Sequence, residues 1–137
     1  MDWPSTNQVD ETISAFARLG VKVMITELDV DLLPAATRSR SAEVSMNVAG
    51  SRKLNPYAAG LPELLQQKLA QRYADLFSVF VAHRGQITRV TFWGVTDGDS
   101  WLNDWPVRGR TSYPLLFDRS CHPKPAFAAV VHTASIN

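Results

Sequence analysis

The sequence has 137 residues, of which 45% are hydrophobic and 20% charged, with a formal net charge of +1. These values are typical of one globular domain and exclude an acidic tail or a strongly basic nucleic-acid surface. Cys121 is the only cysteine, so an intrachain disulfide is excluded; no apolar run could span a membrane, and no signal-peptide pattern follows Met1.

The first predicted element is a helix over residues 5–19. Ser5 can cap it, and Gln8 three residues later completes a capping-box pattern. Gly20 follows at the position of a C-terminal glycine cap. One face of this helix is apolar at the spacing of helical turns, with Val9, Ile13, Phe16 and Ala17.

The next predicted element is a strand over residues 21–28. Val21, Val23 and Ile25 share one face, while Met24 and Leu28 lie on the other. Because apolar residues occupy both faces, the pattern favours a buried strand of a parallel sheet. Residues 30–60 then show no clear period, which predicts a long connection of the kind that is usually functional or disordered.

A long helix is predicted from Pro62 to Gly85, followed by a second buried strand over residues 87–95. A loop rich in tryptophan and aspartate comes next, and a last helix begins near Pro125. The long helix carries an apolar stripe of Leu65, Leu69, Tyr73, Leu76, Phe77 and Phe80, and the last helix is expected to use Phe127, Val130 and Val131.

Helices and strands therefore alternate, which indicates parallel strand–helix units of the α/β class. Two strands cannot form a parallel sheet that is covered on both faces. A complete eight-stranded barrel of such units needs roughly 250 residues. The pattern alone thus predicts part of a larger structure.

In such barrels the active site lies at the carboxyl ends of the strands, where Glu27 and Asp29 follow the first predicted strand. They point to the same side, roughly 6.6 Å apart along the chain. Their spacing leaves open an acid/base couple, a metal site or an arrangement in which one orients a partner. A strand-end glutamate that is simply solvated or caps the next turn is the alternative for Glu27.

Tryptophans near the second strand are the other candidates. Trp93 and Trp101 lie among polar residues and suit a platform for sugar rings. Trp105 is expected in the core instead. His83, near the end of the long helix, is expected to interact with the helix dipole rather than to act in catalysis. Cys121 and the adjacent histidine do not predict a metal site, because a structural zinc needs four ligands.

Several segments, in order, resemble motifs of family 10 glycoside hydrolases. The segment VMITELDV at residues 23–30 is similar to that family's seventh-strand motif, and residues 91–102 resemble its eighth strand and following loop. Residues 114–118 and 123–127 resemble the C-terminal signature, and Asp2-Trp3-Pro4 resembles the stretch after the sixth strand.

The resemblance implies the C-terminal portion of a (β/α)8 TIM barrel, about strands 7 and 8, with residues 1–137 as a partial catalytic domain. It implies retaining hydrolysis of β-1,4-xylan without a cofactor or metal, in an enzyme that is secreted or periplasmic. Glu27 matches the nucleophile, and Asp29 an aspartate that holds a histidine which orients it. Trp93 and Trp101 match substrate-binding tryptophans; Arg108 and Arg110 are left without an assigned role.

The family's acid/base glutamate and this histidine match nothing in the chain, so the missing N-terminal barrel portion is an expected partner, and the chain alone is expected not to hydrolyse xylan. No partner among nucleic acids or membranes is expected. One alternative is a non-catalytic carbohydrate-binding remnant that uses Trp93 and Trp101. The other is an unrelated metal-dependent hydrolase that uses Glu27 and Asp29, disfavoured because no other ligands are suitably spaced.

Overall fold

The computed structural model describes residues 4–34 and 53–135, and the chain alternates between helices and strands as predicted. Asp2 and Trp3, and residues 35–52 of the expected long connection, lie outside the described residues. The elements in chain order are α1 (Thr6–Arg18), β1 (Val23–Leu28), α2 (Glu63–Ala82), β2 (Ile87–Phe92), the short 3-10 helix η1 (Trp101–Asn103) and α3 (Pro125–Ser135).

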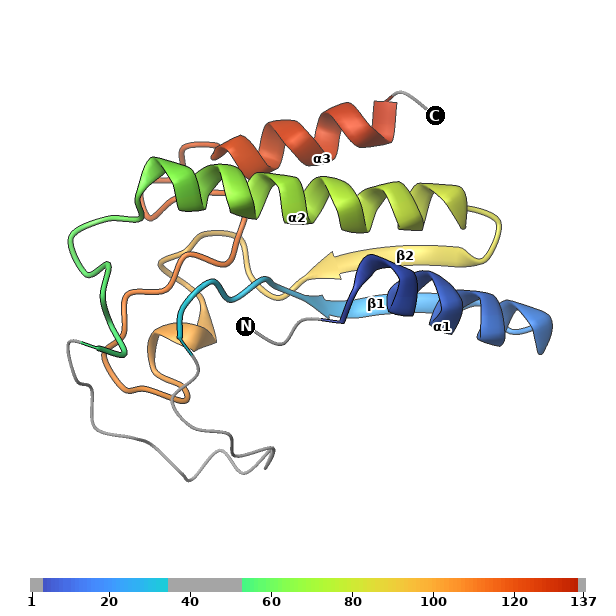
Figure 1. The fold of residues 1–137 in the computed structure, drawn as a ribbon, viewed down its shortest axis with the longest axis horizontal. Helices are drawn as coiled ribbons and strands as arrows, with labels where there is room; N and C mark the ends of the chain where they lie inside the picture. The colour runs from blue at the N-terminus through green and yellow to red at the C-terminus, as the bar shows by residue number, and fades with distance from the viewer. Residues whose placement is uncertain (1–3, 35–52, 136–137) are drawn as a thin grey trace.

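The two strands, β1 and β2, pair in parallel, which confirms the predicted type of sheet. Their register places Val23 opposite Ile87 at one end and Leu28 opposite Phe92 at the other. Helix α2 connects them in sequence and lies along the sheet, α3 lies along α2, and α1 lies beside β1 (Figure 1). The loops that follow both strands gather at one end of the molecule, together with η1.

The hydrophobic core lies where the helices meet the sheet. Leu69 and Tyr73 of the predicted α2 stripe are fully buried, and the remainder of that stripe is buried or packs against the same cluster. In α3 the expectation for Val131 is wrong, because its side chain is 47% exposed. The buried members of the cluster are Ile13, Leu28, Val30, Leu32, Leu69, Ala70, Tyr73, Leu76, Val79, Phe80, Leu116 and Ala126.

The second face of β1 is buried at Leu28, as predicted, but not at Met24. Met24 is 54% exposed, whereas Val23 and Ile25 on the other face pack against the core. The reason is that no described element covers the sheet at Met24. Apolar exposure continues onto nearby residues, since Phe16, Leu19 and Val21 are 48%, 75% and 47% exposed.

The predicted start of the first helix is confirmed in detail. The Ser5 backbone N–H donates to Gln8 Oε1 at 2.7 Å, and the Gln8 backbone N–H donates to Ser5 Oγ at 3.1 Å. Gly20 has a φ of 75°, as a glycine after a helix end often does. No helix within the described ranges has the length and hydropathy that a membrane span requires.

Three element ends differ from the prediction by two residues or more. Strand β1 begins at Val23 rather than Val21. Helix α2 ends at Ala82 rather than Gly85, with His83 as its cap. Strand β2 ends at Phe92 rather than Val95. The cause in β2 is Gly94, whose φ of 142° turns the chain away from the sheet.

Candidate active site

The carboxyl end of β1 presents Glu27 and Asp29, and a backbone hydrogen bond ties this end to the next strand. The Trp93 N–H donates to the Leu28 carbonyl at 3.0 Å, so the residues that follow β1 and β2 lie side by side. Glu27 is exposed, and its carboxylate accepts no hydrogen bond from the described part of the chain. Because parallel strands end at the same edge, one carboxylate and one indole reach the same surface.

Asp29 is held by a tryptophan of the second loop. Trp101 Nε1 donates to Asp29 Oδ2 at 2.9 Å. Burial raises the pKa of the Asp29 carboxyl; the hydrogen bond from Trp101 opposes that rise, and the nearby Asp31 and Glu27 charges add to it. This carboxylate therefore lies at the junction of the two loops, and its expected role toward a histidine stays a prediction.

The two tryptophans expected to contact substrate both reach solvent. Trp93 is 46% exposed and Trp101 41% exposed. Trp105 stacks on Trp101, with ring centroids 4.7 Å apart and an interplanar angle of 18°. The expectation that Trp105 lies in the core is wrong, since its side chain is only partly buried and is not in the core cluster. The surface thus has two exposed indoles, one of which is backed by a third.

A buried arginine joins the two loops and was not recognised in the sequence as structural. Arg110 is 2% exposed and donates to Asp31 Oδ2, to the Pro34 carbonyl at 3.2 Å and to Ser112 Oγ at 3.3 Å. Arg108, by contrast, is exposed. The sequence shows only the segment Arg108-Gly109-Arg110, and this pattern does not predict which of the two arginines is buried.

A buried ion pair between Lys124 and Asp97 holds the loop that follows β2. Lys124 Nζ donates to both carboxylate oxygens of Asp97, at 3.1 and 2.8 Å, and to the carbonyls of Tyr113 and Leu115. The Leu115 N–H also donates to Asp97 Oδ1 at 2.9 Å. In the sequence Lys124 is notable only because it lies between two prolines, and this pattern does not predict that it pairs with Asp97. Asp97 therefore has a structural role in this loop.

Asn103 organises the same loop through both ends of its amide. Its Nδ2 donates to the carbonyls of Asp97 and Gly98, at 2.9 and 3.2 Å. Its Oδ1 accepts from the Ser112 N–H and from Arg119 NH2, at 3.0 and 2.8 Å. The loop that carries Trp101 is therefore cross-linked internally, although it has little regular secondary structure.

The histidines lie away from this surface or lack ligand partners. His83 Nε2 lies 2.7 Å from Asp10 Oδ1, at the end of α2 opposite to the strand ends. His122 is exposed and close to Asp118. Within residues 4–34 and 53–135, no three His, Cys, Asp or Glu side chains gather where they could hold a metal ion. The described residues thus give the metal-dependent alternative no support.

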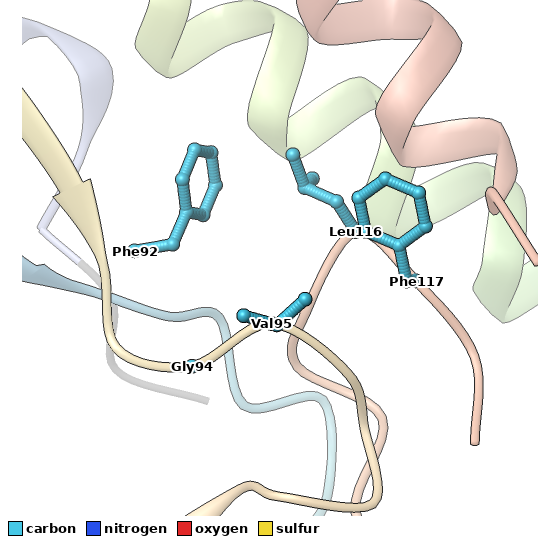
Figure 2. Close-up of a pocket in the computed structure, with 5 residues that line it drawn as sticks. All are labelled: Phe92, Gly94, Val95, Leu116 and Phe117. Atoms are coloured by element: carbon cyan, nitrogen blue, oxygen red, sulfur yellow. The ribbon is translucent and has the colours of Figure 1, made fainter. Parts of the chain in front are cut away.

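An apolar pocket of about 200 Å³ lies between the end of β2 and the segment before α3. Figure 2 shows the side chains of Phe92, Leu116 and Phe117 arranged around it, with Val95 at its edge. Its lining carries no titratable side chain. This pocket suits hydrophobic packing rather than acid–base chemistry, so the strand-end surface remains the candidate site.

The chain is similar to known proteins along nearly its whole length. The family model described as glycosyl hydrolase family 10 matches residues 1–133. The chain is 42% identical to endo-1,4-beta-xylanase A of Xylanibacter ruminicola, covering 95% of the chain and 35% of that protein. It is 36% identical to a beta-1,4-xylanase of Dictyoglomus thermophilum, covering 94% of the chain and 32% of that protein. The chain thus spans about a third of the length of these relatives.

Solved structures give the same relationship. A GH10 endoxylanase retrieved from sugarcane soil metagenome superposes with a TM-score of 0.90 at 46% identity, covering 96% of this chain and 38% of that one. Xylanase B from Clostridium stercorarium F9 superposes with a TM-score of 0.76 at 36% identity, covering 94% of this chain and 33% of that one.

Proposed function

The chain belongs to glycosyl hydrolase family 10, and we propose that it supplies the nucleophile and one wall of the substrate cleft in a retaining endo-1,4-beta-xylanase. Its fold is the C-terminal part of a (β/α)8 barrel, with β1 and β2 as about the seventh and eighth strands. One observation carries the proposal: Glu27 reaches solvent at the carboxyl end of β1, beside the tryptophan-bearing loop after β2.

The proposed chemistry uses Glu27 as one of two carboxyl groups. Retaining glycosidases hold these groups about 5–5.5 Å apart. The Glu27 carboxylate attacks the anomeric carbon, the glycosidic C–O bond breaks, and the departing oxygen takes a proton from an acid outside this chain. Water then cleaves the glycosyl ester. Asp29 is proposed to orient Glu27 through a histidine, also outside this chain.

Nearby aspartates are poor candidates for the missing acid. Asp97 is 1% exposed and paired with Lys124, and Asp31 pairs with Arg110. Both carboxylate oxygens of each aspartate already accept hydrogen bonds within the described part of the chain, so each side chain is held in place by the fold. The chain is therefore proposed to carry one half of the catalytic pair.

We propose that residues 1–137 form a partial catalytic domain whose partner is the remainder of the barrel. Among the described residues the sheet has two strands, so β1 and β2 each leave one edge unpaired. Phe16 and Leu19 at the end of α1 and Met24 of β1 also have exposed apolar side chains. Unpaired strand edges and apolar surface favour association with further strands and helices.

The decisive experiment is a chimera in which this chain replaces the matching 38% of the metagenome endoxylanase. We expect the chimera to release reducing sugar from xylan and the chain alone to release none. Glu27→Gln should reduce the chimera to background, whereas Glu63→Gln, an exposed glutamate at the start of α2, should leave it active. Full activity of the Glu27→Gln chimera would sink the assignment.

A rescue experiment separates a nucleophile from a merely structural glutamate. In a Glu27→Gly chimera, azide can enter the vacated space and attack the anomeric carbon of an aryl β-xylobioside. The product is then an α-xylobiosyl azide, because a single displacement inverts the configuration. Formation of this product supports the nucleophile; an inactive variant that azide does not rescue contradicts it.

A second candidate function, carbohydrate binding without catalysis, is favoured by the exposure of Trp93 and Trp101. Aromatic faces stack on sugars without needing the second carboxylate. A chimera that binds xylohexaose but does not turn over xylan would favour this alternative over the enzyme.

A further inference from the structure

We infer that Trp105 is a positioning residue that holds the indole of Trp101 ready for a β-1,4-linked pyranose, an inference that rests on the proposed function. Trp105 lies in the loop beyond η1, and its backbone N–H donates to the Trp101 carbonyl at 3.1 Å. Its ring stacks on that of Trp101 with centroids 4.7 Å apart and 18° between the planes.

The position of the Trp101 ring is restrained in two independent ways. The hydrogen bond from Nε1 to Asp29 Oδ2, at 2.9 Å, restrains its edge and therefore its rotation within the ring plane. The Trp105 ring restrains its tilt, because the two planes are nearly parallel. A side chain that is already restrained loses less conformational entropy when a ligand binds.

Stacking also determines which face of Trp101 is available. One face of the indole is covered by Trp105, yet Trp101 remains 41% exposed. The exposed area therefore belongs to its edge and to the opposite face. A single free indole face accommodates one pyranose ring by its C–H face, so the pair presents a one-sided platform.

The contribution of Trp105 comes from its planar ring and not from its N–H group. Trp105 Nε1 is buried and has no hydrogen-bond partner among the described residues. A buried donor without an acceptor destabilises the fold. Phenylalanine at this position should therefore keep the stacking face without the unsatisfied donor, whereas leucine or methionine should fill the space without a planar face.

The experiment measures Trp101 directly in the 137-residue chain. Solvent exchange of the Trp101 indole N–H is followed by NMR, and binding of xylohexaose by calorimetry. In Trp105→Leu and Trp105→Met we expect N–H exchange to quicken and binding to weaken, each by about 2- to 10-fold, the range for one aromatic pair. Trp105→Phe should stay within about 2-fold of wild type for both.

The outcomes distinguish this inference from the proposed function. Unchanged exchange in both the leucine and methionine variants overturns the inference, whatever happens to binding. Faster exchange with unchanged binding also overturns it, because the restraint would then not serve the sugar. If the wild-type chain does not bind xylohexaose, or if Trp101→Ala binds it as tightly as wild type, Trp101 is not a sugar platform. The positioning role of Trp105 then fails as well. The proposed role of Glu27 is tested separately by the chimera.

Discussion

Lys124 Nζ lies 2.8 Å from Asp97 Oδ2, and the two side chains are only 4% and 1% exposed. The pair links the loop that follows β2 to the residue just before α3. Burial raises the pKa of the Asp97 carboxyl and lowers the pKa of the Lys124 ammonium, because the loss of water outweighs their mutual attraction. The pair therefore depends on both partners being present.

Removing one partner should be costly. Lys124→Met leaves the Asp97 carboxylate buried without its cation, and we expect a loss of about 3–5 kcal/mol in the free energy of unfolding by urea. Lys68→Met, on an exposed position of α2, should change it by less than about 0.5 kcal/mol. The double variant Asp97→Asn/Lys124→Met should lose less than Lys124→Met alone; simple addition of the single effects would contradict coupling.

The hydrogen bond between Trp101 and Asp29 predicts a titration shift. It opposes the effect of burial, so Trp101→Phe should raise the pKa of the Asp29 carboxyl further above its ordinary 3.8. Carbon-detected NMR measures this value. Asp118, whose pKa is lowered by the backbone N–H groups of His122 and Ser120, should titrate unchanged in the same sample. An unchanged Asp29 pKa in Trp101→Phe would show that the bond is not made in solution.

The same shift gives a direction for stability. Because the pKa of Asp29 is higher in the folded state than in the unfolded one, the native chain binds this proton more tightly. The contribution of Asp29 to the free energy of unfolding is therefore largest at pH values below 3.8 and falls as pH rises through the folded-state pKa. Asp29→Asn should remove this part of the pH dependence.

Local patterns were sufficient for the elements of the fold. The capping box at Ser5 and the apolar stripe of α2 depend on residues a few positions apart, and both were predictable. The parallel pairing followed from the apolar strands. What failed was Met24 on the second face of β1. It looks like a core residue in the sequence but is exposed, whereas Leu28 on the same predicted face is buried, because burial depends on which element covers each position.

The candidate site was predictable only as a set of residues. Glu27, Asp29, Trp93 and Trp101 were named from strand ends and from a family resemblance, and their roles stay predictions. Their contacts were not predictable, since Trp101 and Asp29 are 72 positions apart and Arg110 and Asp31 are 79 apart. No local pattern carries such a pairing.

Gly94 should tolerate no side chain. Its φ is 142°, and an added Cβ would lie 2.7 Å from Leu115 Cδ1. Gly94→Ala should therefore lower the free energy of unfolding by about 1–3 kcal/mol, from backbone strain and overpacking together. Gly85→Ala is the matched control, because a Cβ there meets nothing within 4 Å; it should be neutral or slightly stabilising. Equal effects at both glycines would contradict this account of the end of β2.

Arg108 and Arg110 are two positions apart, but their substitution should change the free energy of unfolding by very different amounts. Arg110 bridges the loop after β1, through Asp31 and the Pro34 carbonyl, to Ser112 in the loop after β2, whereas Arg108 is exposed. Arg110→Met removes these charge-assisted hydrogen bonds and should cost at least about 2 kcal/mol in unfolding free energy. Arg108→Met should cost less than about 0.5 kcal/mol.

The same pair tests whether the two loops form one unit. Because Arg110 ties the segment that follows Asp29 to the segment that follows Trp101, its loss should also quicken amide hydrogen exchange at Leu33, whose N–H donates to Asp31 Oδ1 at 2.9 Å. Exchange within α1, which Arg110 does not contact, serves as the internal reference. If Arg110→Met leaves Leu33 as protected as wild type, the loops are held together by the contact between Trp101 and Asp29 instead, and Arg110 acts only within its own loop.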